Sequence, residues 1–232
     1  VEYKTGAAQS QVVAFDPNTS GRFVLAYSDS VNGTAVVGTL TGTSISFGSE
    51  YVFSTYPTSE VDLAFDPNTA GMFVLAYRES TGDKRGKVIV GTISGNSLSF
   101  GTEVTVTTLW AINILISFDP HTAGKFVTTY WDSANASRGT IRVGTVSGTS
   151  ISMGGSVAFS SSVGDYTSMS IDPYIVDRVV VTYRDHANLY YGTARVGTNS
   201  GSSVSFGAEY VFNSDSASTL QHFNGCEEDV HN

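Results

Sequence analysis

Several residue types that would point to a familiar class of chemistry are scarce in this chain. It has one cysteine, Cys226, among 232 residues, so no disulfide can form within it. A cysteine nucleophile needs a positioned base, and the acidic segment "NGCEEDVHN" is a poor place to build a water-excluded site. The four histidines, His121, His186, His222 and His231, show no metal-ligand spacing. We therefore expect no metal, no cofactor and no cysteine chemistry.

Charge is also scarce, and its sign is wrong for nucleic acid. Charged residues make up 14% of the chain, the basic ones number 12, and the net charge is −9. Binding to a phosphate backbone depends on Lys and Arg, so we expect no nucleic-acid partner. The longest apolar run, "WAINILISF", is far shorter than the roughly 20 residues of a membrane-spanning helix, and we expect no membrane insertion. No signal peptide is visible at Val1, which we interpret as the start of a processed or excised chain.

Internal repetition is what the chain has in abundance. The tripeptide Val-Gly-Thr recurs with a constant spacing of 53 residues, at 37–39, 90–92, 143–145 and 196–198. A period of this length is typical of propellers and other repeat architectures. The spacing divides the chain into repeats at about 7–54, 55–107, 108–160 and 161–213, with terminal strands at 1–6 and 214–224 and a flexible acidic tail at 225–232.

Each repeat predicts four strands and no helix. In the second repeat the strands are "VDLAFD", "MFVLAY", "KVIVGT" and "SLSFGTEVTV", rich in β-branched and aromatic residues. Phe73, Leu75 and Tyr77 fall on one face of the second strand and Val74 and Ala76 on the other, so a bulky face should meet a small one between neighbouring sheets. We predict an all-β protein, a β-propeller of four-stranded blades. Its terminal strands either pair within one molecule, as a partial fifth blade, or pair between molecules.

An Asp-Pro pair stands between the first and second strands of every repeat. In "DPNTAG" the Asp side chain can accept hydrogen bonds from backbone amides, Pro pre-sets φ, and Gly permits a positive φ. A hydrolase needs two carboxylates in different surroundings, whereas residues related by repetition have nearly the same surroundings. We assign a structural turn role to the four aspartates, Asp16, Asp66, Asp119 and Asp172.

The combined pattern FDPNTAGxFVxAY…VGTxSGxSISFG, at 65–100, resembles tandem repeats of uncharacterised surface and virion-associated proteins of aquatic bacteria and their phages. The resemblance covers Val1 to about Asn224 and implies an extracellular or virion-surface location. The length and number of the repeats are also loosely similar to those of small propeller lectins, although their sugar-contacting motifs have no counterpart here. That likeness implies carbohydrate binding or adhesion.

A candidate ligand site follows the second strand of each repeat, where the pattern Tyr-x-acid recurs. An aromatic ring beside a carboxylate is what a saccharide site uses. The alternative is that the tyrosine belongs to the core and the acid caps a loop, and the position of the tyrosine in the buried stripe favours this alternative. The intervening residue varies and is expected to be exposed. The candidate set is Asp29, Arg78, Glu79, Trp131, Asp132, Arg184 and Asp185.

The two tryptophans receive different roles. Trp110 belongs to the apolar run and is expected in the core or in the packing between blades, whereas Trp131, beside Asp132, is the better ligand platform. Because near-symmetry disfavours catalysis, we predict a non-enzymatic recognition or adhesion module that binds a glycan or a cell-surface receptor. The alternative is a structural fibre subunit that associates with itself through its terminal strands.

Overall fold

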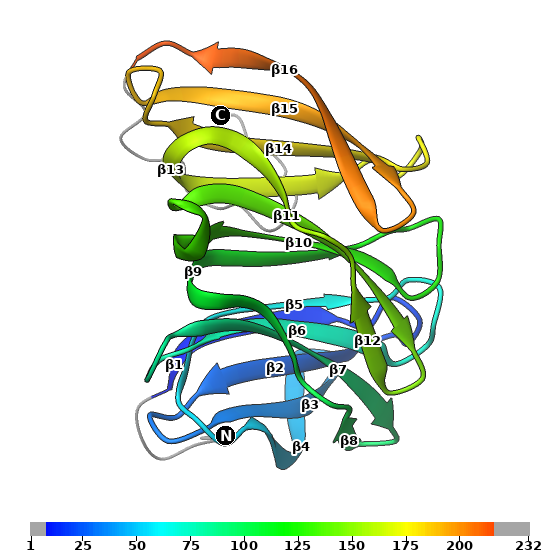
Figure 1. Cartoon of the computed structure of the whole chain (residues 1–232). Helices are drawn as coiled ribbons and strands as arrows, with labels where there is room; N and C mark the ends of the chain where they lie inside the picture. The colour runs from blue at the N-terminus through cyan, green and yellow to red at the C-terminus, as the bar shows by residue number, and fades with distance from the viewer. Residues whose placement is uncertain (1–7, 216–232) are drawn as a thin grey trace, which may run out of the picture.

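The computed structural model describes residues 8–215 and confirms an all-β chain (Figure 1). The strands form four successive groups, which we name units I to IV, and within each unit neighbouring strands are antiparallel. Among the described residues, the only helical element is a short 3-10 helix, η1 (Ser133–Asn135). The four-stranded repeat read from the sequence is therefore the structural unit of the fold.

The bounds of the strands follow the repeat. Unit I contains β1 (Gln9–Phe15), β2 (Arg22–Ser28), β3 (Gly33–Thr41) and β4 (Ser44–Ser54). Unit II contains β5 (Thr58–Phe65), β6 (Met72–Glu79), β7 (Arg85–Ser94), β8 (Ser97–Phe100) and the start of β9 (Val104–Phe118). Unit III contains the end of β9, β10 (Lys125–Asp132), β11 (Arg138–Ser147), β12 (Ser150–Met153) and the start of β13 (Val157–Ile171). Unit IV contains the end of β13, β14 (Arg178–Asp185), β15 (Tyr191–Ser200) and β16 (Ser203–Asn213).

Two long strands each belong to two units. The start of β9 pairs with β7, as in Thr105 opposite Lys87, while its end pairs with β10, as in Phe118 opposite Phe126. Strand β13 joins units III and IV in the same way. Units II, III and IV therefore lie in one twelve-stranded sheet, whereas unit I is a separate sheet of four strands.

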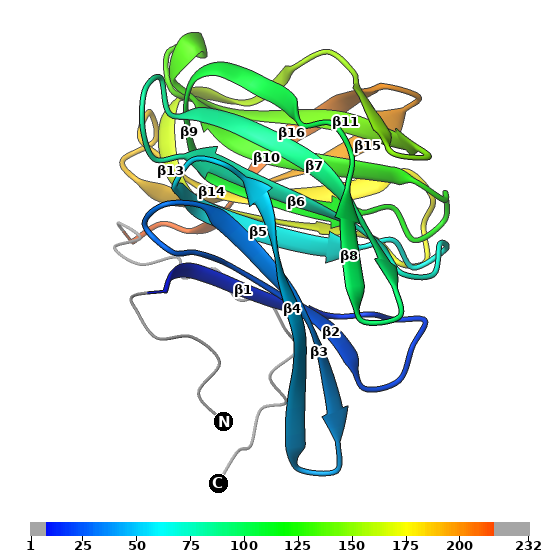
Figure 2. The same ribbon diagram turned by 90° about the horizontal axis from the view of Figure 1, so that it is seen from below.

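The units are stacked in chain order, from β1–β4 at one end to β14–β16 at the other (Figures 1 and 2). Three buried clusters join successive units. In the cluster between units I and II, the bulky Phe73 and Leu75 of unit II pack against the small Val24 and Ala26 of unit I. The expected contact of a bulky face with a small one is thus what holds neighbouring units together.

Each first strand is interrupted at the same place. Ser10, Glu60, Asn113 and Tyr166 stand six residues before the Asp-Pro pair and have positive φ angles of 51°, 51°, 54° and 51°. The register of strand pairing shifts at all four places. A bulge of this kind bends a strand and re-aims its side chains.

The Asp-Pro corners are built as turns. An Asp16 carboxylate oxygen accepts a hydrogen bond from the Asn18 amide at 2.9 Å, and Asp66 accepts one from the Asn68 amide at 2.9 Å. The corners also contact each other, since the Asn68 side chain donates to the Pro120 carbonyl of the next unit at 3.2 Å. Asp119 and Asp172 accept from the backbone two residues on in the same way. These corners act as turns and as links between units.

The two ends of the stack do not pair with each other among the described strands, because β1 and β16 lie in different sheets. The expected pairing of the terminal strands 1–6 and 214–224 lies outside the described residues, apart from Ser214 and Asp215. Within residues 8–215, no helix has the length and apolar character that crossing a bilayer requires.

Candidate functional site

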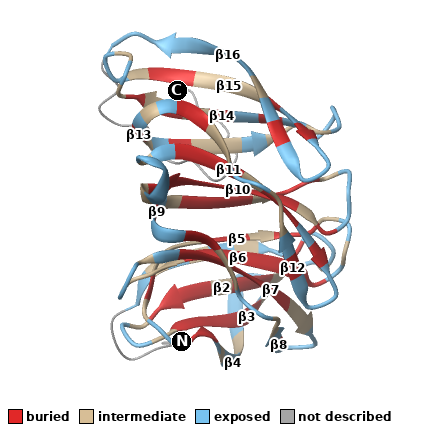
Figure 3. Cartoon of the chain, viewed as in Figure 1, coloured by how far each residue is buried: buried red, intermediate tan, exposed pale blue. Residues whose placement is uncertain are grey.

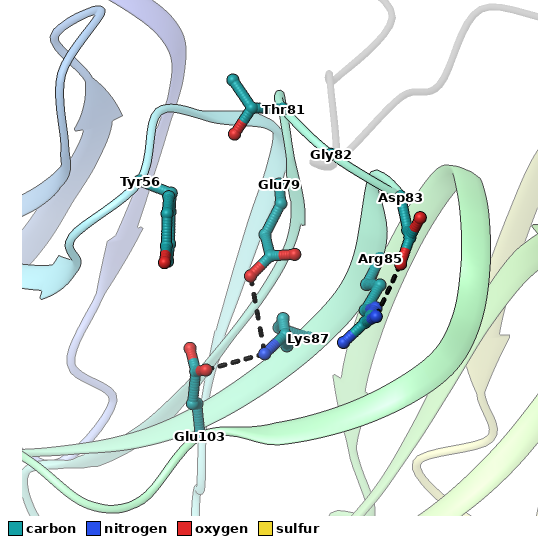
Figure 4. Close-up of a pocket in the computed structure, with 8 residues that line it drawn as sticks. All are labelled: Tyr56, Glu79, Thr81, Gly82, Asp83, Arg85, Lys87 and Glu103. Carbon is teal, nitrogen blue, oxygen red and sulfur yellow. Dashed lines mark hydrogen bonds and ion pairs between the residues drawn. The ribbon is translucent and has the colours of Figure 1, made fainter.

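A pocket of about 390 Å³ opens at the end of unit II, beside the loop that follows β6 (Figure 4). Polar side chains make up most of its wall, with three carboxylates, two cations and one aromatic ring. The residues that line it are Tyr56, Glu79, Thr81, Gly82, Asp83, Arg85, Lys87 and Glu103. Glu79 is the one member of the candidate set from the sequence analysis that lines this pocket.

Four different segments bring these side chains together. Tyr56 lies in the connection from unit I to unit II, and Glu79 is the last residue of β6. Lys87 lies on β7, which pairs with β6 so that Lys87 is opposite Tyr77. Glu103 lies just before β9. The pocket therefore forms only when the strands of unit II have assembled.

Lys87 organises the floor of the pocket. It is a buried cation, and its ammonium nitrogen lies 2.7 Å from a Glu103 oxygen and 3.5 Å from a Glu79 oxygen (Figure 4). A buried ammonium is costly unless it is paired, and two carboxylates meet that need. The Glu79–Lys87–Glu103 array is thus a fixed set of donors and acceptors.

Tyr77 supports this array from the core. Its hydroxyl donates to the second Glu103 oxygen at 2.8 Å. Burial, together with the hydrogen bond to Glu103, raises the pKa of Tyr77 well above its usual value, so the hydroxyl stays protonated and donates. Burial alone would raise the pKa of Glu103, but the hydrogen bonds from Lys87 and Tyr77 outweigh it and lower that pKa. Glu103 is therefore an ionised acceptor.

The rim of the pocket adds an aromatic ring and a second ion pair. Tyr56 is exposed and its ring stands beside Glu79 and Glu103 across the opening (Figure 4). Arg85 and Asp83 form a surface ion pair of 2.5 Å on the opposite side. A ring that offers an apolar face beside carboxylates and cations can cover a sugar ring and hydrogen-bond its hydroxyls.

The tyrosines of the Tyr-x-acid pattern lie in the core, as the alternative interpretation held. Tyr27, Tyr77, Tyr130 and Tyr183 are all buried. The aspartates that follow three of them cap the next loop. Asp29 accepts from the Asn32 amide at 2.7 Å, Asp132 from the Ala134 amide at 3.0 Å and Asp185 from the Ala187 amide at 2.9 Å. Only the fourth acid, Glu79, lines the pocket described above.

The expected exposure of Trp131 is wrong. Its side chain is 2% exposed and packs edge-to-face against Phe159 at 5.7 Å and against Tyr183 at 6.3 Å. The physical reason is the neighbour in unit IV, since Gly164 has no side chain and its backbone leaves room for the indole. Trp131 is thus part of the contact between units III and IV.

The expected burial of Trp110 is also wrong. Trp110 is 43% exposed, and the Lys84 ammonium lies 4.3 Å from the centre of the indole ring. It occupies the bend of β9 between units II and III, where the strand leaves one sheet for the next. The apolar run continues on either side of this bend, which is why the sequence suggested a core position.

The two arginines of the candidate set face the first strand of their own unit. Arg78 donates to the Ser59 hydroxyl at 3.0 Å and forms an ion pair of 3.0 Å with Glu60. Burial raises the pKa of Glu60 in spite of Arg78. Arg184 donates to an Asp165 oxygen at 2.6 Å, and its guanidinium lies 4.7 Å from the centre of the Tyr166 ring. Neither arginine lines the unit II pocket.

Sequence reasoning missed most of the pocket, although one signal for it exists. Lys87 is the only cation at its position in the repeat, where the other units have Thr34, Thr140 and Thr193. A charged residue that replaces a buried threonine needs partners, and Glu79 and Glu103 are the carboxylates nearest to it in the unit. For metal binding, the part of the chain that the structure describes has no group of three His, Cys, Asp or Glu side chains.

Comparison with known proteins shows the fold alone. No family model matches the chain, and no curated protein matches it. Among solved structures, the chain is similar to a putative 6-phosphogluconolactonase from Bacteroides uniformis, with a TM-score of 0.63 and 12% identity over 91% of this chain and 57% of that one. It is also similar to Sqt1 from Chaetomium thermophilum, with a TM-score of 0.56 and 16% identity over 82% and 43% of the two chains.

A third similar structure is an exo-β-1,3-galactanase from Phanerochaete chrysosporium with β-1,3-galactotriose. The TM-score is 0.51 and the identity 8%, over 89% of this chain and 53% of that one. The chain spans about half of the length of the solved structures that it matches. At these identities the likeness identifies a large antiparallel all-β architecture, and the site must be argued from its own residues.

Proposed function

We propose that the chain is a non-enzymatic recognition module, built as part of a β-propeller, and that the unit II pocket binds a glycan. The four stacked units of four strands, and the likeness to solved structures that cover most of this chain, support the propeller. The likeness to a galactanase with a bound galactotriose makes a carbohydrate-related β-fold plausible. The pocket also lies beside a loop at the end of a unit, and binding residues commonly lie on loops that a rigid scaffold positions.

The observation that carries the proposal is the exposed Tyr56 ring facing a fixed polar array. Glu79, Lys87 and Glu103 hold each other in place, so their remaining lone pairs are oriented before a ligand arrives. Pre-orientation reduces the entropy cost of binding. Because charges of both signs line the wall, an uncharged saccharide that both donates and accepts hydrogen bonds fits this pocket best.

The electrostatics of the pocket favour binding over hydrolysis. A glycosidase keeps one carboxylic acid protonated through a raised pKa, so that it can protonate the leaving oxygen. In this pocket the pKa of Glu103 is lowered, and one ammonium is shared by both carboxylates. A lowered pKa suits a hydrogen-bond acceptor that stays ionised, which is the role we assign to Glu103.

The natural setting follows as part of the same proposal. A module that displays a glycan site on a rigid stack of sheets would act as an adhesin or lectin on an extracellular or virion surface. Its partner there would be the saccharide of a cell-surface receptor. The sequence resemblance to surface and virion-associated repeats supports this setting.

A glycan array on the purified chain tests the proposal, followed by calorimetric titration of the strongest hit. We expect Tyr56→Ala to weaken binding about fivefold, because stacking on an aromatic ring contributes about 1 kcal/mol. Lys87→Met should weaken it as well, since both carboxylates lose the cation that holds them.

Tyr174→Ala is the matched control, because Tyr174 is an exposed tyrosine in unit IV, away from the pocket. It should leave glycan affinity unchanged. No binding across a diverse array, or equal affinities for Tyr56→Ala and the parent chain, would reject the glycan site.

A further inference from the structure

A second pocket, of about 440 Å³, lies between units II and III, and we name it the corner pocket. Figure 3 shows β6 and β10, the second strands of these two units, buried along most of their length. The corner pocket lies where β6 begins, at Met72, whereas the unit II pocket lies where β6 ends, at Glu79. The two pockets are therefore separate sites at opposite ends of one strand.

The wall of the corner pocket has no charged side chain. Unit II contributes Thr69, Met72 and Thr92 to it, and unit III contributes Gly124, Val146 and Thr149. Apolar groups and a few hydroxyl groups thus surround the opening. A wall of this kind suits the apolar part of a small ligand.

The reason for the pocket is a departure from the repeat at Met72. Units I, III and IV have a basic residue six positions after the Asp of the corner, namely Arg22, Lys125 and Arg178. The Arg22 guanidinium donates to an Asp16 carboxylate oxygen at 2.9 Å, and the Lys125 ammonium lies 3.5 Å from an Asp119 oxygen. Unit II has Met72 at this position, which cannot form such a pair.

In units I and III the basic side chain also reaches the corner of the next unit. A Cβ atom built on Gly71 would lie 3.4 Å from an Arg22 guanidinium nitrogen, and the Lys125 ammonium lies 2.6 Å from an Asp177 oxygen. The counterpart of Gly71 and Asp177 is Gly124, which lines the corner pocket. The pocket is therefore the space that a basic side chain occupies at the other two contacts between units.

Asp66 is the carboxylate that the missing basic residue would pair with. It is 0% exposed, and its two oxygens accept from the Asn68 amide at 2.9 Å and from the Gly124 amide at 2.8 Å. Within residues 8–215 it has no ion pair. A buried carboxylate is costly without a cation. Asp66 thus lies directly behind a wall residue of the pocket and lacks the counter-ion that Asp16 and Asp119 have.

We propose that the corner pocket binds a small organic cation, an alkyl chain that ends in a guanidinium or ammonium group, and that Asp66 is its counter-ion. The ligand takes the place of the side chain that units I and III supply themselves. The Met72 side chain is unbranched and flexible, so it can rotate and let the cation reach the carboxylate. Val146 and the Met72 thioether then contact the alkyl chain, and the Thr69 hydroxyl can accept a further hydrogen bond.

The chemistry of the site favours an organic cation over other ligands. An anion would be repelled by Asp66, and a neutral ligand would leave that carboxylate without a counter-ion. A bare metal ion needs several oxygen ligands, whereas Met72, Val146 and Gly124 offer no side-chain oxygen. A guanidinium group matches the geometry of a carboxylate, as Arg22 and Asp16 show in unit I.

An NMR titration of the whole chain with butylguanidinium tests the proposal. We expect saturable shifts of the Gly124 amide and of the Met72 methyl group. The Gly71 amide is the internal control, because Arg22 fills the corresponding space beside it. Butylurea has a similar shape and no charge, and it should bind at least about tenfold more weakly because it cannot neutralise Asp66.

Met72→Arg is the decisive variant, because it restores the basic residue of units I, III and IV. Its own guanidinium should pair with Asp66 and abolish the shift of the Gly124 amide. Met72→Leu is the matched control, since it keeps an apolar wall without adding a charge, and it should still bind butylguanidinium. These two variants leave Asp66 and its hydrogen bonds to the Asn68 and Gly124 amides in place.

Three results would overturn the proposal. They are no saturable shift of the Gly124 amide, equal affinities for butylguanidinium and butylurea, and undiminished binding to Met72→Arg. A comparison of butylguanidinium with acetyl-arginine amide identifies the source of the cation. Tighter binding of acetyl-arginine amide would assign the site to an arginine side chain of a partner protein, and the reverse order would assign it to a free amine or guanidine. Either order supports a cation site at Asp66.

Discussion

Units II and III place different structures at the same position after the second strand. Unit II has an open pocket with Glu79, Lys87 and Glu103. In unit III the counterparts are Asp132, Thr140 and Ser156, and the neighbouring Trp131 is buried against unit IV. The same scaffold position thus lines an open pocket in one unit and packs against a neighbouring unit in the next.

The difference shows which parts of the repeat are constrained. The second strand keeps its alternation of bulky and small residues in both units, because each face has a neighbour to fit. The residues that follow the strand meet different neighbours in each unit. A binding site can therefore arise in one unit without disturbing the stack.

The largest test of this comparison is Trp131→Ala. Truncation of a buried aromatic removes apolar contact and leaves a cavity, so we expect a loss of about 3–5 kcal/mol in the free energy of unfolding. Chemical denaturation measures it. Trp110→Ala is the control, with a loss of about 1 kcal/mol or less because that indole is half-exposed. Similar losses for the two variants would mean that Trp131 does not pack between the units.

A smaller effect separates the acids of the two units. Asp132 is buried and accepts from the Thr107 hydroxyl at 2.7 Å as well as from the Ala134 amide. Asp132→Ala should cost about 1–3 kcal/mol, because buried donors lose their acceptor.

Glu79→Ala in unit II should cost about 1 kcal/mol or less, since Lys87 keeps its closer partner Glu103. Urea unfolding midpoints of the two variants give the comparison. A greater loss of unfolding free energy for Glu79→Ala than for Asp132→Ala would show that the main role of the Glu79–Lys87–Glu103 array is to stabilise the fold.

The smallest expected effect is a pH dependence of stability that comes from Glu103 of unit II, which has no counterpart in unit III because Ser156 stands at its position. The folded-state pKa of Glu103 lies below 4.5, so its ionised form stabilises the fold above that pH. This stabilisation is lost as the pH falls through the lowered pKa. It is small, because the Glu103 side chain is half-exposed.

A carbon-detected NMR titration of the Glu103 carboxyl group measures this pKa directly. Lys87→Met should move the midpoint up toward 4.5, because it removes the strongest donor to the carboxylate. Lys84→Met, at a lysine that lies over Trp110, should leave it in place. An unchanged midpoint in Lys87→Met would contradict the assignment of Lys87 as the organising cation.

Much of the fold could be predicted because repetition and period-2 alternation are local properties of the sequence. The alternation of Phe73, Val74 and Leu75 predicted the two faces of the strand. Tyr77 falls on the same face as Phe73 and Leu75, which identified it as a core residue. The burial of Trp131 could not be predicted in this way. It depends on the absence of a side chain at Gly164, a residue of another unit that the alternation does not relate to Trp131.

The site was harder to predict than the fold for a similar reason. Tyr56, Glu79, Lys87 and Glu103 come from four segments, and they form a pocket only through strand pairing. What the sequence does contain is the departure of Lys87 from the threonine of the other units. In a repeat protein, such a departure from the pattern is a better indicator of a site than the pattern itself.

The sharing of β9 and β13 between units has a consequence for how the protein unfolds. Units II, III and IV are joined by continuous backbone hydrogen bonding, since each shared strand pairs in two units. Opening one of them therefore breaks pairing in the next, which makes their unfolding cooperative. Unit I is attached to unit II through side chains, without a shared strand. The stack thus has a cooperative body of three units and one terminal unit that can open by itself at lower free energy.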